Sequence, residues 1–186
     1  MMERTGETPP CPNARITGVV YSLYFLTAIS AEAFIGRGRP VAYHAVNVIA
    51  HVLYIAVTLL FYFMFKPVNR SLSLLAALFS LAGCANDLLD LFNRAPYKIN
   101  SLLFFAPYCL LIGYLILRSS FLPRFLGVLM VLAGVGWLVF MSPHANHLST
   151  YLMVLGFVAE AALMLWLVVM GVNVQRWKEQ ASASVA

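Results

Sequence analysis

Charged residues are scarce in this chain. Lys, Arg, Asp and Glu make up 10% of the 186 residues, whereas 62% are hydrophobic and the mean hydropathy is +0.84. A soluble domain carries about a quarter charged residues, so this composition excludes an ordinary soluble fold. The Lys and Arg residues fall singly or in pairs between hydrophobic runs. This pattern is typical of charges that flank a membrane and not of a nucleic-acid surface.

Cysteine is also scarce, and common catalytic motifs are missing. Cys11, Cys84 and Cys109 are an odd number, and the last two fall inside hydrophobic runs, so we expect no disulfide framework. The sequence contains no P-loop, no G-x-S-x-G, no HExxH and no CxxC motif. The sequence therefore contains none of the motifs that usually indicate kinase, hydrolase or thiol-redox activity. Enzymatic activity stays open, but the sequence favours a non-enzymatic protein.

Long apolar runs are what the sequence has in abundance. Pro, Gly, Asn or charged residues separate six of them. Each run has the length of about 20 residues that crosses the hydrocarbon core as a helix. Helix is required because backbone groups in lipid must pair within their own segment. The sequence therefore predicts an all-α integral membrane bundle of six transmembrane helices with short loops, at residues 15–35, 42–66, 71–93, 97–117, 122–142 and 148–172.

Such a bundle leaves no room for a second domain. We expect an N-terminal tail over residues 1–14, one transmembrane domain over 15–173 and a C-terminal tail over 174–186. Short links make neighbouring helices antiparallel. The side of the two tails then receives most of the positive charge, which puts both tails in the cytoplasm. The tail side holds Arg4, Arg15, Lys66, Arg70, Arg118, Arg124, Arg176 and Lys178, against Arg37, Arg39, Arg94 and Lys98 on the other side.

The first run has a competing interpretation. Arg15, the apolar stretch and Ala31-Glu32-Ala33 imitate a signal peptide with an A-x-A cleavage site. The apolar stretch continues through Phe34 and Ile35, so we favour an uncleaved anchor.

Polar residues inside the runs gather on two helical faces. In the second run they recur at spacings of 3, 4, 3 and 4, which places them on one face of a helix. In the third run, Asp87 and Asp90 lie one turn apart. Ionisable groups at membrane depth are costly, so each is a candidate site residue. The polar face of the second run consists of His44, Asn47, His51, Tyr54 and Thr58.

The expected topology brings these faces to the outer ends of their helices. Glu32 ends the first run on that side, and His144 and His147 lie in the loop before the last run. We predict a polar chamber that is lined by the first three helices, opens to the non-cytoplasmic side and is covered by that loop. Its candidate ligand-binding residues are Glu32, His44, Asn47, His51, Tyr54, Asp87, Asp90 and Glu160.

Three interpretations of these polar residues stay open. Polar side chains can simply hydrogen-bond between helices, and Asp90 can pair with Arg94. Alternatively, the protein is a metal-dependent membrane hydrolase, or a haem-binding electron carrier with His44 or His51 as axial ligand. The cofactor is therefore unknown, with zinc and haem as candidates. The candidate zinc ligands are His44, His51, Asp87, Asp90 and His147.

Glu160 stands apart because it lies near the middle of the last run. Such a carboxyl group is either protonated or paired with a group on another helix. The candidate partners are Tyr21, Tyr108 and Tyr114. We favour a hydrogen bond between helices over a proton relay.

Several stretches resemble a bacterial membrane family called domain of unknown function family 4386. The most specific is Gly113–Gly127, and Arg15–Tyr21, Lys66–Leu72 and Glu160 with Leu165–Asn173 also fit. The resemblance implies a bacterial inner-membrane protein of six or seven helices, without an established activity and without catalytic residues to transfer. The links around the second and third helices are shorter here than in similar members.

These observations predict a multi-pass protein of the bacterial inner membrane. We expect it to bind a ligand, an ion or a protein partner through the polar chamber. Its expected surroundings are the lipid bilayer and either a membrane-protein partner or a second copy, with no nucleic acid.

Overall fold

The computed structural model describes residues 13–35, 38–94, 99–142 and 147–183, and the regular structure in these ranges is entirely helical. The prediction of an all-α fold is confirmed. Seven α-helices and one π-helical turn lie in the described part of the chain. They are α1 (Ala14–Ser30), η1 (Ala31–Ile35), α2 (Pro40–Phe65), α3 (Arg70–Leu91), α4 (Leu102–Arg118), α5 (Arg124–Phe140), α6 (Ser149–Val169) and α7 (Val174–Ala183).

Most of these helices have the composition of membrane spans. Four helical stretches are long and apolar enough to cross a membrane, namely Ala14–Ala33, α2, α3 and α6. The apolar helices α4 and α5 are shorter, at 17 residues each. Large apolar side chains such as Leu26, Val52 and Leu165 are exposed along these helices. Apolar surface of this extent indicates contact with a lipid bilayer and hence a multi-pass membrane protein.

The helices begin at the breaks that the sequence indicates. Pro40 is the first residue of α2, a position that suits proline because the first helical N–H groups have no partner within the helix. Asn69 caps α3, since its side-chain oxygen accepts a hydrogen bond of 2.9 Å from the backbone N–H of Leu72. Pro123 directly precedes α5.

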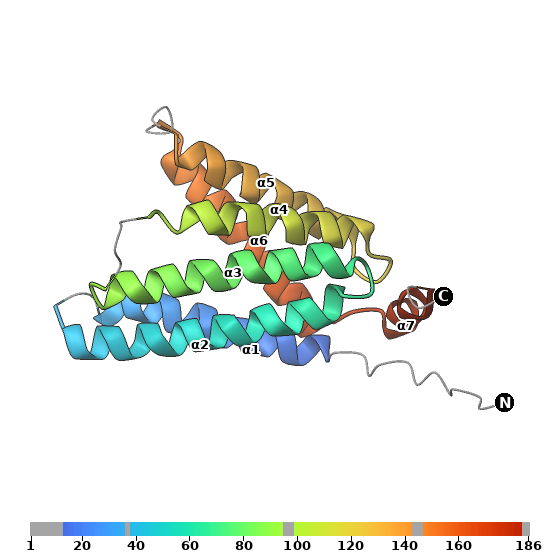
Figure 1. Ribbon diagram of the computed structural model, residues 1–186, viewed down its shortest axis with the longest axis horizontal. Coiled ribbons are helices and arrows are strands. Elements are labelled where there is room, and N and C mark those ends of the chain that lie inside the picture. The colour runs from blue at the N-terminus through green and yellow to red at the C-terminus, as the bar shows by residue number, and fades with distance from the viewer. Residues whose placement is uncertain (1–12, 36–37, 95–98, 143–146, 184–186) are drawn as a thin grey trace.

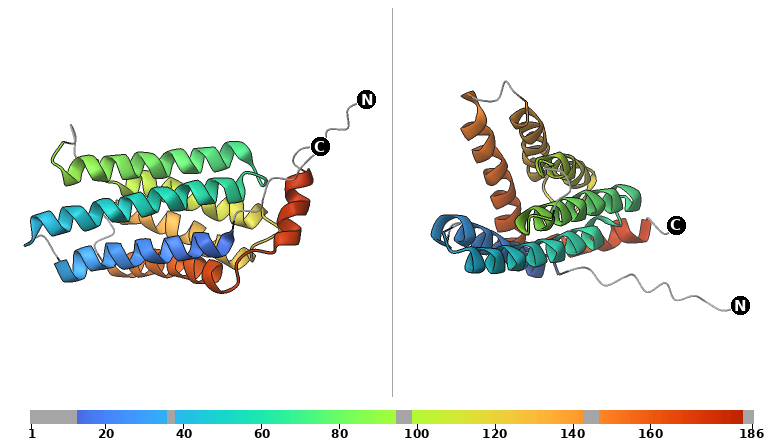
Figure 2. Two further views of the ribbon diagram at one scale, coloured as in Figure 1. Left: turned by 90° about the horizontal axis from the view of Figure 1, so that it is seen from below. Right: turned by 60° about the vertical axis from the view of Figure 1, so that its left-hand side comes forward.

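The first six α-helices run antiparallel to their neighbours in sequence (Figure 1). Each packs against the next, and α6 returns to pack against α1, so the six helices close into a ring. The ends of α1 and α3 therefore lie beside the starts of α2 and α4 (Figures 1 and 2). The antiparallel order expected from the short links is confirmed.

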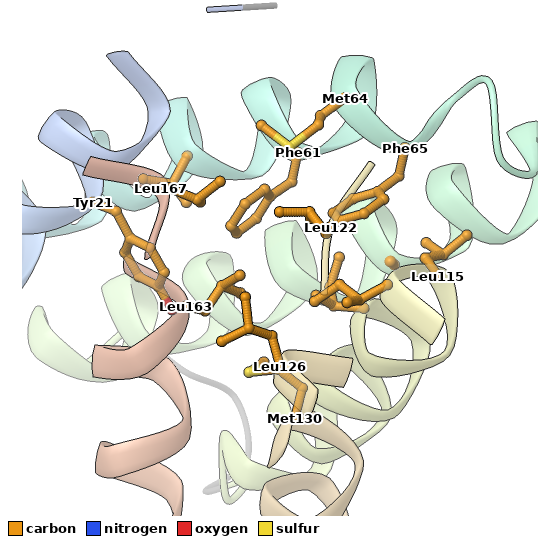
Figure 3. Packing of buried hydrophobic residues seen from close by; sticks show 14 of the residues in the cluster. Tyr21, Phe61, Met64, Phe65, Leu115, Leu122, Leu126, Met130, Leu163 and Leu167 are labelled. Carbon is orange, nitrogen blue, oxygen red and sulfur yellow. The ribbon is translucent and has the colours of Figure 1, made fainter. Parts of the chain in front are cut away.

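The ring is packed tightly at one end only. Five of the six helices have most of their buried residues in the half nearer to α7, and α5 has half of its buried residues there. Phe61, Phe65, Leu126 and Leu163 meet there in a dry core (Figure 3). Towards the opposite end, α5 and α6 lean away from the layer of α1, α2 and α3 (Figure 2, right). Cavities can therefore form at the end away from α7.

Helix α7 lies in the segment that was expected to be a tail. It crosses the tightly packed end of the bundle (Figures 1 and 2). Trp177 is 1% exposed, and its indole N–H donates a hydrogen bond of 2.9 Å to the backbone carbonyl of Met64 at the end of α2. Gln180 bonds to Ser120 in the link between α4 and α5. These contacts dock α7 onto the ring.

Candidate functional site

Two adjoining cavities lie between the helices at the end away from α7. Their volumes are about 320 Å³ and 510 Å³, and both are lined by Asn47, His51 and Asp87. The smaller extends inwards to Tyr54 and sideways to Glu32, and the larger extends to His44 and Asp90. We call the two cavities together the chamber. Every residue predicted to bind a ligand lines it except Glu160.

His51 and Asp87 meet where the two cavities join. The Nε2 atom of His51 lies 3.6 Å from Oδ2 of Asp87. The other ring nitrogen, Nδ1, is 2.7 Å from the backbone carbonyl oxygen of Asn47, one helical turn earlier. The side chain of His51 is 18% exposed and that of Asp87 is 45% exposed. The pair is thus oriented by the helix on one side and accessible from the chamber on the other.

Glu32 reaches the chamber from the π-helical turn η1. The wider turn of a π-helix is frequent at functional sites. The hydroxyl group of Tyr43 on α2 donates a hydrogen bond of 2.5 Å to Oε1 of Glu32. The chamber thus receives carboxylates from η1 and from α3, whereas none of its lining residues in the described part of the chain is Lys or Arg.

Other residues of the polar faces tie helices together. Both ring nitrogens of His44 lie within hydrogen-bond distance of backbone carbonyl oxygens, Nδ1 at 2.5 Å from Pro40 and Nε2 at 2.9 Å from Leu91. Neither nitrogen is free to bind a metal in this arrangement. Deeper in the bundle, the hydroxyl groups of Thr58 and Ser80 lie 2.5 Å apart and join α2 to α3. The interpretation as hydrogen bonding between helices is confirmed for these residues.

The predicted ion pair between Asp90 and Arg94 is not found in the described part of the chain. Helix α3 ends at Leu91, and Asn93 adopts a positive φ of 53°. The backbone turn at Asn93 takes Arg94 away from the position one helical turn above Asp90 that the prediction assumed.

The described residues provide no set of side chains that could coordinate a metal ion. Among the described residues, no three His, Cys, Asp or Glu side chains lie close enough together to hold a metal ion. His147 is exposed just before α6 and lines neither cavity of the chamber. His144 and the central part of its loop lie outside the described residues, so the cover over the chamber remains a prediction.

Helix α4 contributes chamber residues that sequence reasoning missed. The hydroxyl group of Ser101 donates a hydrogen bond to Oδ1 of Asp87, and the side-chain amide of Asn86 donates to Ser101 at 3.0 Å. Phe105 forms part of the apolar wall. Ser101 lies near the start of the fourth run, on the same side as Asp87, and this topological position was the signal that could have identified it.

Glu160 lies beside a third cavity, of about 460 Å³, between α1 and α6. The hydroxyl group of Tyr21 donates a hydrogen bond of 2.7 Å to Oε2 of Glu160, which confirms one of the three predicted tyrosine partners. Tyr24, Ala28 and Glu32 line both this cavity and the chamber. The two spaces are therefore neighbours across α1.

Comparison with known proteins agrees with the resemblance seen in the sequence. The family described as Domain of unknown function (DUF4386) matches residues 86–171. This range includes Asp87, the Gly113–Gly127 stretch and Glu160, whereas Arg15–Tyr21 and Lys66–Leu72 lie outside it. An uncharacterized protein of Archaeoglobus fulgidus is 27% identical over 160 residues, which cover 77% of this chain and 93% of the relative. No solved structure matches the chain.

Proposed function

We propose that this chain, which carries a DUF4386 domain over residues 86–171, is a non-enzymatic membrane protein that binds a small polar ligand or a cation in the chamber. The observation that carries the proposal is the pair of His51 and Asp87 at the junction of the two cavities. A pair that served only to join helices would be packed into the core, as Thr58 and Ser80 are. Instead, nearly half of the Asp87 side chain is exposed.

The charge of the chamber supports the choice of ligand. Glu32, Asp87 and Asp90 line it, and among the residues that the structure describes no Lys or Arg does. Carboxylates at the edge of a low-dielectric region attract positive charge and accept hydrogen bonds. Metal ions, ammonium compounds and polyhydroxyl compounds are therefore the ligand classes that fit the chamber best.

We further propose that all six helices of the ring cross the membrane, with the chamber on the non-cytoplasmic side. At 1.5 Å per residue, the 17 residues of α4 and of α5 span about 25 Å, close to the thickness of the hydrocarbon core. Arg15, Lys66, Arg70, Arg118 and Arg124 flank the helix ends near α7, which favours that end as the cytoplasmic one. The bacterial inner membrane is the proposed location.

Thermal unfolding of the purified protein tests the proposed ligand binding. Wild type, His51→Ala and Asp87→Ala are measured alone and with Zn²⁺, Mg²⁺, Na⁺ or ethanolamine. At least one of these compounds should raise the unfolding temperature of wild type by several degrees, because a ligand that binds only the folded state stabilises it. Neither variant should respond, although both should fold.

Thr58→Val is the matched control for this experiment. It removes the hydroxyl group that joins α2 to α3 and leaves the chamber pair intact. This variant should lose stability and keep the response to the ligand. If His51→Ala and Asp87→Ala only lower stability as Thr58→Val does, and none of the compounds stabilises wild type, the pair is structural and the proposal is wrong.

A further inference from the structure

The cavity between α1 and α6 combines a buried carboxyl group with aromatic walls. Glu160 is 7% exposed and lines this cavity. Its Oε2 atom accepts the hydrogen bond from Tyr21, and Oε1 has no hydrogen-bond partner among the described residues. Burying a carboxyl group this deeply costs free energy unless the group accepts a hydrogen bond or pairs with a positive charge. The second oxygen is therefore available for a ligand.

Four aromatic side chains surround the same cavity, Tyr24 and Phe25 from α1, Trp137 from α5 and Phe157 from α6. We call these four residues the aromatic cage. The rings of Phe25 and Phe157 lie 5.6 Å apart at an angle of 71°, which brings α1 and α6 into contact at this level. Aromatic faces carry partial negative charge and attract cations, most strongly where water is excluded.

The charges of the residues that line the cavity also favour a bound cation. Within the described ranges, the cavity is lined by two acidic residues, Glu160 and Glu32, and by no Lys, Arg or His. Its remaining lining residues, including Ile29 and Met153, are apolar. A site with carboxylates, aromatic faces and apolar contacts selects a positive charge attached to an apolar body.

The packing of the helices explains why a cavity forms at this level. Gly18 brings α1 against the backbone of α6 near Leu167 and Val168, towards the α7 end. The two helices separate towards Glu32, and α5 and α6 lean outwards at that end (Figure 2, right). The exposed side chains of Ile29 and Phe157 lie at the rim, where lipid-soluble molecules can enter from the bilayer.

We propose that this cavity binds the ammonium group of a lipophilic organic cation, with Glu160 as its counter-ion and the aromatic cage around it. The site is separate from the pair of His51 and Asp87 and does not require a ligand in the chamber. It shares Glu32 and Tyr24 with the chamber, so a bound cation lies beside the chamber as well.

The test uses benzyltrimethylammonium and neopentylbenzene, in which a carbon atom replaces the nitrogen and the charge is lost. Each is titrated into the detergent-solubilised protein by calorimetry, and the heat measured with protein-free micelles is subtracted. The ammonium compound should bind at least about tenfold more tightly than the neutral compound, because the carboxyl group and the cage recognise its charge. Equal binding of the two would show that the cavity only accepts apolar molecules and would overturn the proposal.

Variants locate the bound cation. Glu160→Gln keeps an oxygen for the hydroxyl group of Tyr21 and removes the charge, so affinity for the ammonium compound should fall at least about tenfold. Trp137→Leu should also weaken binding, whereas Trp137→Phe should restore most of it because it keeps an aromatic face. This second pair tests the cage even if Glu160→Gln fails to fold.

The variant Asp87→Asn shows whether the cation binds in this cavity or in the chamber. Asp87 lines the chamber and not the cavity between α1 and α6, so the affinity for benzyltrimethylammonium should stay within about twofold of wild type. A loss as large as that of Glu160→Gln would place the cation in the chamber and overturn the proposal. No stabilisation of wild type by any chamber ligand, with intact binding of the ammonium compound, would instead contradict the chamber proposal alone.

Discussion

Single residues show which polar groups join helices and which remain accessible. The spacing of the polar face on α2 identifies His44, His51 and Thr58 equally well, because spacing reports only the side of a helix. Their roles differ because different chemical groups lie opposite their side chains. Backbone carbonyl oxygens face His44, and the hydroxyl group of Ser80 faces Thr58. Only His51 meets a partly exposed carboxylate, and no local sequence signal distinguishes it.

The pair of Tyr21 and Glu160 gives a prediction at this scale. Tyr21→Phe removes the donor to a buried carboxyl group and should lower the free energy of unfolding by about 1–3 kcal/mol. Tyr114→Phe is the control, since Tyr114 is 46% exposed on α4. Thermal unfolding in detergent compares the two variants. Equal stability of both variants and wild type would show that the hydrogen bond contributes nothing.

At the scale of helices, the close approach of α4 and α5 depends on glycine. A Cβ atom at Gly127 would lie 2.8 Å from the carbonyl oxygen of Gly113, and one at Gly113 would lie 2.9 Å from that of Gly127. Backbone atoms cannot move aside as a side chain can. The Gly113–Gly127 stretch that resembles the family thus has a structural role, the contact of two helices at small residues.

Substitution of these glycines tests the contact. Gly127→Ala should force α4 and α5 apart and destabilise the fold by about 1–3 kcal/mol. Gly136→Ala is a matched control on the same helix, because its Cβ would meet the side chains of Leu152 and Leu155 at 3.5 Å and 3.6 Å, which is ordinary van der Waals contact. Thermal unfolding should separate the two variants by several degrees. Similar unfolding temperatures would contradict the requirement for glycine at this contact.

Helix α7 was not predicted because it contains no hydrophobic run. Its polar composition indicates a tail, and only the spacing of four residues between Trp177 and Ala181 marks the buried face. The ranges of the longer helices were predicted to within about five residues, since their ends coincide with Pro, Gly, Asn or charge. Long apolar runs thus define the ring, whereas docking of α7 depends on tertiary contacts.

The docking of α7 should contribute measurably to stability. Trp177→Ala removes a buried ring and its hydrogen bond to Met64, and should cost about 3–5 kcal/mol. Val174→Ala, at a position that is 48% exposed, should change little. Limited proteolysis of the C-terminal segment, together with thermal unfolding, measures both effects. Unchanged protease resistance in Trp177→Ala would show that α7 does not need this anchor.

For the whole molecule, the order of the helices was predictable but the asymmetry of their packing was not. Short links dictate antiparallel neighbours, and this placed Glu32, His51 and Asp87 at one end of the bundle. The lean of α5 and α6 depends on side-chain packing along the entire helices, and it opens the cavity beside Glu160. The sequence therefore indicated one chamber, and the structure adds a neighbouring cavity.

The central claim is that the chamber around His51 opens to the non-cytoplasmic side. The most direct measurement is the reaction of His51→Cys with a membrane-impermeant, positively charged thiol reagent in intact cells. It is made in a background without Cys11, Cys84 and Cys109, with Thr58→Cys as the buried control. Our account predicts that the cysteine at position 51 reacts from outside the cell and that the control does not. Reaction only after the cytoplasmic side is exposed, or none at all in a folded variant, would contradict it.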